Sequence, residues 1–101
     1  MSLVDLDATF LALADPPRRA VVSRLGEGPA TPNALAQPFD MSLQAVSKHL
    51  KVLERAGIVT RTPSAQQRPA HLNVAALVNA SRWLAGFQGS STKATNVSMT
   101  C

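Results

Sequence analysis

The chain has 101 residues, of which 46% are hydrophobic and 16% are charged; it is the size of one domain and too apolar to be disordered throughout. Ten Lys and Arg against six Asp and Glu give a net charge of +4, which favours a polyanionic partner, either nucleic acid or an anionic membrane. The single cysteine, Cys101, excludes an intrachain disulfide and therefore a secreted disulfide scaffold.

Two helices are predicted in the first quarter of the chain. Apolar residues recur at helical spacing before the paired prolines, at Leu3, Leu6, Phe10 and Leu13. In the next segment, DPPRRAVVSRLGEG, Asp15 can cap a second helix and Pro16 can occupy its first position. Gly26 and Gly28 then end this helix.

The following segment predicts a short helix, a turn and a long helix. In TPNALAQPF, Thr31 can cap and Pro32 can start a third helix of barely two turns, which Pro38 ends. The turn DMS follows, and Ser42 can cap a fourth helix. Gly57 supplies a left-handed residue at the end of that helix.

A β-hairpin and a final helix complete the predicted order. The β-branched segment IVTRT and the segment AHLNV can pair around the tip PSAQQRP. Asn73 can cap a last helix that runs to about Phe87, after which QGSSTKATNVSMTC loses apolar periodicity. We therefore predict a mainly α fold with a small hairpin (α-α-α-α-β-β-α), as one domain over residues 1–88 and a disordered tail over residues 89–101.

The fourth helix has two different faces. With about 100° of rotation per residue, Val46, Leu50 and Leu53 share one side. The opposite side is polar and basic, with Gln44, Ser47, Lys48, Lys51 and Arg55. A short helix, a tight turn and such a helix form a helix-turn-helix, whose second helix lies in the major groove of DNA. The alternative interpretation is a solvated face without a ligand.

The residue types on this face suit base recognition. Ser42, Gln44, Ser47 and Lys48 lie toward the N-terminal end, where a recognition helix meets base edges. Gln can bond adenine in bidentate fashion, Lys can reach guanine acceptors, and Ser can take either role. The residues farther along, Lys51 and Arg55, are better placed for phosphates.

The hairpin would form the wing of a winged helix-turn-helix. Its two arginines, Arg61 and Arg68, can reach a flanking minor groove or its phosphates. An exposed turn that makes no contact is the alternative interpretation.

Two motifs resemble those of a known family. The segments ALADPPRR and MSLQAVSKHLKVLERAGIV are similar to the helix junction and the recognition helix of the ArsR/SmtB-type winged helix-turn-helix repressors. The resemblance covers about residues 10–84. It implies a homodimeric bacterial transcriptional regulator that binds a palindromic operator in double-stranded DNA, often represses its own operon, and releases DNA when an inducer binds.

The resemblance also assigns residues. Family members contact DNA from positions that match Ser42, Gln44, Ser47, Lys48 and His49. By rotation, His49 lies at the border of the apolar stripe, where it can bond a phosphate or stay in the core and bond backbone. The wing departs from the family pattern of a Gly-Arg tip and aromatic second strand, since SAQQRPAHL stands there.

Metal sensing is not expected. Many relatives use a Cys-x-Cys pair at residues matching 32–37, or acids and histidines on the last helix, and neither is present. Two histidines, His49 and His71, and one terminal thiol do not assemble a four-ligand zinc site within one chain. No cofactor is predicted, and a small-molecule inducer is left open. Trp83 and Phe87 could line a pocket for one, although residues at this spacing more often pack.

The terminal helices are more apolar than one core requires. The apolar arc of the last helix is wide, and the first helix has apolar residues off its stripe, such as Leu11. We therefore predict a two-fold dimer in which these helices pack across the axis. The predicted interface residues are Leu6, Phe10, Leu11, Leu77, Leu84 and Phe87.

Other classes of protein are less well supported. No nucleophile has His and acid partners, and no Gly-rich phosphate loop or HExxH pattern occurs, so we expect no enzyme and no catalytic residue. A winged-helix module that binds protein or RNA is the alternative. The acidic N-terminus does not suit a signal peptide, and no apolar run approaches the ~20 residues that cross a bilayer. We expect a cytoplasmic protein without a membrane partner.

Overall fold

The computed structural model describes residues 3–63 and 68–90, except for the side chains of residues 3–5 and 88–90. The elements follow the predicted order: α1 (Leu3–Ala12), α2 (Pro16–Leu25), α3 (Pro32–Ala36), the 3₁₀ turn η1 (Gln37–Phe39), α4 (Leu43–Arg55), β1 (Val59–Arg61), β2 (Ala70–Leu72) and α5 (Val74–Ser90). The predicted fold class is therefore confirmed. The hairpin tip, residues 64–67, and residues 91–101 lie outside the described residues. Of the predicted disordered tail, residues 89–101, only Gly89 and Ser90 are described, and they belong to α5.

Side-chain caps fix the starts of three helices. The Asp15 carboxylate accepts the N–H of Arg18 at 3.2 Å, and the Thr31 hydroxyl accepts the N–H of Ala34 at 3.3 Å. At the start of α4, the Ser42 hydroxyl accepts an N–H at 3.1 Å. Each cap satisfies a backbone donor that the first helical turn leaves without a partner. Three of the four predicted caps are thus confirmed. The side-chain amide of the fourth residue, Asn73, donates to the carbonyl of Gly57.

The third helix ends differently from the prediction. Pro38 lies inside the turn η1, because a proline in the first positions of a helical turn has no hydrogen bond to lose. The chain then reverses at Asp40, which is left-handed with φ 53°, and the N–H of Met41 donates to the carbonyl of Ala36 at 3.1 Å. This reversal sets the short α3 against the long α4.

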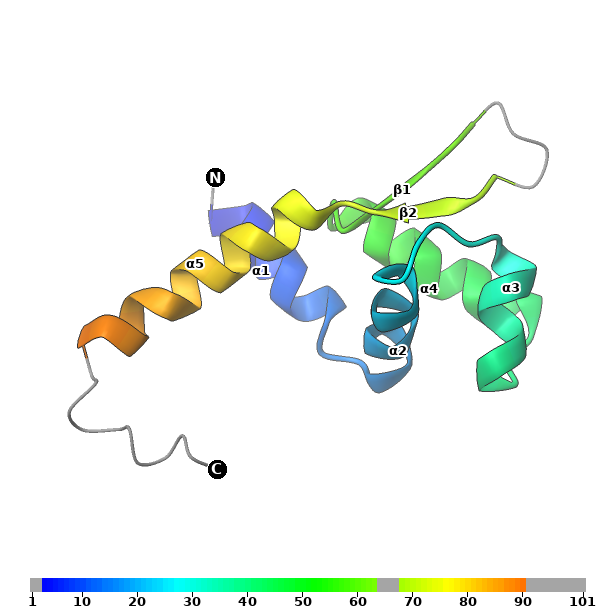
Figure 1. The fold of residues 1–101 in the computed structure, drawn as a ribbon, viewed down its shortest axis with the longest axis horizontal. Coiled ribbons are helices and arrows are strands. Elements are labelled where there is room, and N and C mark those ends of the chain that lie inside the picture. The colour runs from blue at the N-terminus through cyan, green and yellow to red at the C-terminus, as the bar shows by residue number, and fades with distance from the viewer. Residues whose placement is uncertain (1–2, 64–67, 91–101) are drawn as a thin grey trace.

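The core lies between α2, α3, α4 and the base of the hairpin (Figure 1). Its largest fully buried apolar side chains come from all of these elements: Val21, Leu35, Val46, Leu50, Leu53, Ile58 and Val59. Burying such side chains is the main stabilising contribution to folding, at about 1.5 to 3 kcal/mol each. The inner face of α4 is therefore fixed by packing.

The hairpin is short and is joined to the helices at its base. Antiparallel β1 and β2 pair with Thr60 opposite His71, each over three residues. Ala70 also forms a bridge with Ala30, which precedes α3. At the end of β2, the side-chain amide of Asn73 donates to the carbonyl of Gly57 at 2.8 Å, so the start of α5 is tied to the end of α4.

The last helix extends away from this body, with α1 beside its first part (Figure 1). Phe10 of α1 meets Trp83 edge-to-face, with ring centroids 5.9 Å apart. Trp83 meets Phe87 in the same manner at 4.9 Å. Among the described residues, no helix is both long and apolar enough to cross a membrane.

Candidate nucleic-acid interface

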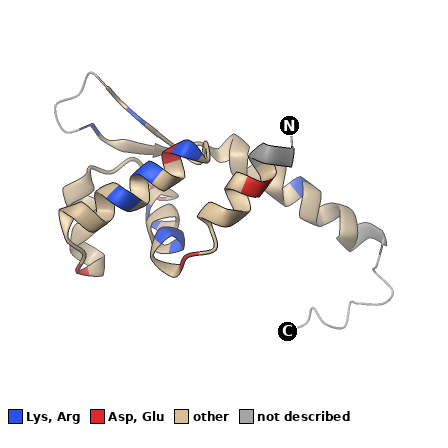
Figure 2. Ribbon diagram, turned by 180° about the vertical axis from the view of Figure 1, so that it is seen from behind, with Lys and Arg blue, Asp and Glu red and all other residues tan. Residues whose placement is uncertain are grey.

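The outer face of α4 is open to solvent along its whole length. Val46, Leu50 and Leu53 on the inner face are completely buried. All six predicted contact residues on the outer side of the helix and its cap are exposed: Ser42, Gln44, Ser47, Lys48, Lys51 and Arg55. Figure 2 shows the Lys and Arg positions spaced along this helix. The geometry required for groove binding is therefore present.

Leu43 lies on this surface although the sequence analysis did not include it. It is the first residue of α4 and is 48% exposed. Helical rotation places it almost in line with Leu50, so periodicity alone assigns it to the core. Val46, three residues later, is completely buried, so only the first residue of the helix departs from the pattern, and Leu43 lies next to Ser42 and Gln44 in the sequence. An apolar side chain there can contact a thymine methyl group.

His49 has a partner that neither sequence interpretation included. Its side chain is 20% exposed, and Nδ1 lies 3.9 Å from Oδ2 of Asp15. Asp15 is also the N-cap of α2, so this contact joins the start of α2 to the middle of α4. Within the described residues, the ring of His49 forms no hydrogen bond with the backbone.

Arg61 holds the wing to α4. Its Nε donates to the carbonyl of Arg68 at 2.8 Å, and its Nη1 donates to the carboxylate of Glu54 at 3.3 Å. Its side chain is only 14% exposed. These contacts give Arg61 a structural role. Most of its guanidinium is therefore not accessible to DNA.

Arg68 is the exposed cation of the wing. It follows the undescribed tip, is open to solvent, and has a positive φ of 47°. Of the two predicted wing contacts, Arg68 is therefore the one available to a phosphate.

The ALADPPRR motif joins α1 to α2. Nε of Arg18 donates to the carbonyl of Ala12 at 2.6 Å, and its Nη2 to that of Leu11 at 3.2 Å. Arg19 donates to the carbonyl of Leu13 at 2.8 Å. The two arginines thus satisfy carbonyls that the end of α1 leaves open. This motif is structural rather than part of the DNA-facing surface.

The predicted dimer residues differ in how much of each side chain is exposed. Leu11, Leu84 and Phe87 are 69%, 53% and 57% exposed, whereas Leu6 and Phe10 are half-buried. A further predicted residue, Leu77, packs against the core of its own chain. Other large exposed apolar residues on α5 are Val74, Val78 and Trp83.

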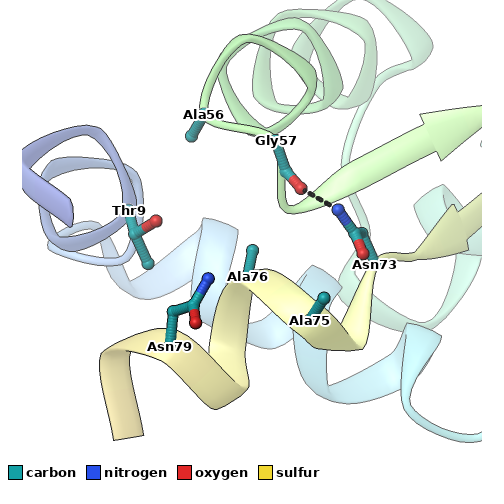
Figure 3. A pocket seen from close by; sticks show the side chains of 7 residues that line it. All are labelled: Thr9, Ala56, Gly57, Asn73, Ala75, Ala76 and Asn79. Atoms are coloured by element: carbon teal, nitrogen blue, oxygen red, sulfur yellow. Dashed lines mark hydrogen bonds between the residues drawn. The ribbon is translucent and has the colours of Figure 1, made fainter. Parts of the chain in front are cut away.

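A cavity of about 400 Å³ lies where α1, the end of α4 and the start of α5 meet. Its walls are small side chains, and Figure 3 shows Thr9 and Asn79 directed into it. Neither Trp83 nor Phe87 lines this cavity, and their ring contacts agree with a packing role. The described ranges 3–63 and 68–90 hold no group of three His, Cys, Asp or Glu that could bind a metal ion.

This arrangement is that of a winged helix-turn-helix protein. The second helix of its helix-turn-helix has a buried apolar face and an open polar face, and a hairpin follows it. Comparison with known proteins supports this class. Residues 13–62 match a helix-turn-helix domain family. An HTH-type transcriptional regulator of Mycobacterium tuberculosis is 43% identical over 67 residues, which are 66% of this chain and 63% of that protein. The transcriptional repressor SdpR of Bacillus subtilis is 28% identical over 82 residues, covering 81% and 91% of the two chains.

A solved structure identifies the family. The crystal structure of an ArsR family transcriptional regulator is 40% identical, with a TM-score of 0.77, over 84% of this chain and 93% of that one. The chain belongs to the ArsR family of transcriptional regulators. The predictions of a regulator rather than an enzyme, and of this family, are confirmed by these relatives.

Proposed function

We propose that the chain binds a palindromic operator in double-stranded DNA as a homodimer, in the cytoplasm, and represses transcription. The observation that carries this proposal is the outer face of α4, which is exposed, polar and basic while the inner face is fully buried. A protein-binding winged helix would instead expose apolar residues over such a face. The repressor role is supported by the similarity to the Bacillus subtilis repressor.

The proposed contacts follow from position along the helix. The first turns of α4 meet base edges through Ser42, Leu43, Gln44, Ser47 and Lys48, and the later positions, Lys51 and Arg55, meet phosphates. Arg68 contacts phosphates from the wing. Arg61 supports the wing through Glu54, and His49 lies 3.9 Å from Asp15 at the start of α2.

A second copy would complete the interface. The exposed apolar residues of α1 and α5 give each chain a surface that an identical surface can cover across a two-fold axis. Two recognition helices about 34 Å apart then reach successive major grooves on one side of the duplex. This arrangement is the reason for expecting a palindromic site.

Selection from random duplexes tests the proposal. Purified protein is incubated with a randomised duplex pool, and the bound fraction is amplified and sequenced. We expect an enriched inverted repeat whose half-sites are about one helical turn apart. Enrichment of no motif would overturn operator recognition, and retention of structured RNA over DNA would favour the RNA-binding alternative.

A further inference from the structure

A second cavity lies beside the C-terminal end of α4, which carries the proposed phosphate contact Arg55. It has a volume of about 350 Å³ and is formed by α1, α2 and the last turns of α4. The residues that line it are Ala8, Leu11, Ala12, Arg18, Val52, Arg55 and Ala56. The cleft is shallow and largely open to solvent, and its volume is near the lower end of the range for small-molecule sites, ~300 to 1,000 Å³.

The walls of this cleft are apolar, and its two polar groups are both guanidinium groups. Five of the seven lining residues are Ala, Leu or Val, so the interior suits an aliphatic or aromatic group. Arg18 already donates to two carbonyls of α1 and lies 3.8 Å from the carboxylate of Asp15. The charge of Arg18 is therefore largely compensated within the chain.

Arg55 is different. Its side chain is exposed, and within the described ranges its guanidinium has no hydrogen bond or ion pair. A guanidinium forms its strongest planar pair with a carboxylate, through two parallel hydrogen bonds. One uncompensated cation at the edge of an apolar cleft matches one negative charge on an apolar molecule.

We propose that this cleft binds a small monocarboxylate with an apolar chain or ring. The apolar part lies against Ala8, Val52 and Ala56, and the carboxylate pairs with Arg55. Leu11 at the rim of the cleft is left to the proposed dimer contact. This inference rests on the proposed function in one respect: Arg55 is also a proposed phosphate contact. A carboxylate on Arg55 therefore competes with the operator backbone and lowers the affinity for DNA.

The first test measures binding without DNA. Octanoate is titrated into the full chain by calorimetry, with the uncharged octanamide as the matched ligand. We expect saturable octanoate binding, and about tenfold weaker binding of octanamide because the charge-assisted pair is lost. Equal binding of the two ligands would overturn the assignment of the carboxylate to Arg55.

Two variants of α4 separate the cleft from the general charge of the helix. Arg55→Ala and Lys51→Ala each remove one exposed cation from the same face, but only Arg55 lines the cleft. Octanoate binding should fall about tenfold in the first variant and stay unchanged in the second. Loss of binding in both variants would indicate non-specific attraction and would overturn the site.

The second test adds the operator. Octanoate should weaken operator binding roughly threefold to tenfold, the worth of about one ionic contact, in the wild type and in Lys51→Ala. The effect should disappear in Arg55→Ala and in Ala8→Phe, whose ring fills the cleft. Dissociation of the dimer by octanoate in sedimentation, with Arg55→Ala still responding, would overturn the proposal.

The proposed ligand site and the proposed operator recognition can fail independently of each other. If the protein enriches no DNA site but binds octanoate in an Arg55-dependent way, the ligand site stands and operator recognition fails. If it binds an operator but not octanoate, the reverse holds.

Discussion

Gln44 stands on the exposed first turns of α4, beside the capped N-terminus. Its amide can pair with the N6 and N7 atoms of adenine, a contact worth about 1 to 3 kcal/mol of discrimination. We therefore expect Gln44→Ala to relax sequence preference by this amount at one base pair of each half-site. Competition binding with operators substituted at single positions measures it.

A glutamine outside the proposed base contacts provides the control. Gln37 is exposed in the turn η1, and Gln37→Ala should leave base preference unchanged. If Gln44→Ala binds every substituted operator in the wild-type order, α4 does not read bases through this side chain.

Arg55 and Arg61 are both arginines near the end of α4 but should respond differently to substitution. Arg55 is exposed, so Arg55→Ala should weaken all DNA sequences similarly and reduce the slope of log affinity against log salt by about 1. Arg61 bonds Glu54 and the carbonyl of Arg68, so Arg61→Ala should lower the free energy of unfolding by about 1 to 2 kcal/mol. Salt-dependent binding and thermal denaturation, measured on both variants, separate the roles. A stability loss confined to Arg55→Ala would reverse the assignment.

Some of this residue-scale detail was predictable from the sequence and some was not. Periodicity correctly separated buried Leu50 from exposed Lys48, because that part of α4 packs on the core with one face and leaves the opposite face to solvent. It could not place Leu43, which is half exposed at the first position of the helix although it is almost in line with buried Leu50. It also could not find the contacts of His49 and Arg61, since their partners are set by the packing of α2 and the hairpin against α4.

Whole elements were more predictable, because their ends depend on local chemistry. Asp15, Thr31 and Ser42 cap their helices through neighbours three residues away, and such contacts are encoded in adjacent sequence. The strands are shorter than the β-branched segments suggested. The strands span Val59–Arg61 and Ala70–Leu72, and one further backbone hydrogen bond, from the N–H of Thr62 to the carbonyl of Pro69 at 3.2 Å, continues their pairing toward the tip.

Replacing Gly57 and Gly86 by alanine should change the free energy of unfolding in opposite directions. Gly57 has φ 80° after the end of α4, and a Cβ there would meet no atom within 4 Å. Gly57→Ala should therefore cost about 1 kcal/mol from backbone strain alone. Gly86 lies inside α5, where an added Cβ would also meet no atom within 4 Å, and Gly86→Ala should stabilise by about 0.5 to 1 kcal/mol. Denaturant titration at one protein concentration checks both. Destabilisation by Gly86→Ala would indicate that a partner chain contacts this position.

The whole molecule is elongated, because α5 projects from the body that carries α4 (Figure 1). Leu84 and Phe87 on this projection are more than half exposed. Leaving such side chains in water forgoes about 1.5 to 3 kcal/mol each that burial would provide. We propose that a second copy of the chain covers them, which accounts for large apolar side chains on the surface of an otherwise well-packed protein.

The double substitution Leu84→Glu and Phe87→Glu tests this proposal for the assembly. Charges placed on both sides of a two-fold interface repel each other and cannot be desolvated cheaply, so we expect a folded monomer in sedimentation at micromolar concentration. Leu43→Glu, which changes a leucine of similar exposure on α4, should remain a dimer. The monomer has only one α4 and should lose most operator affinity while keeping weak, salt-sensitive binding to any duplex. A wild-type chain that sediments as a monomer, or a double variant that remains a dimer, would place the assembly surface elsewhere and remove the physical basis for a palindromic site.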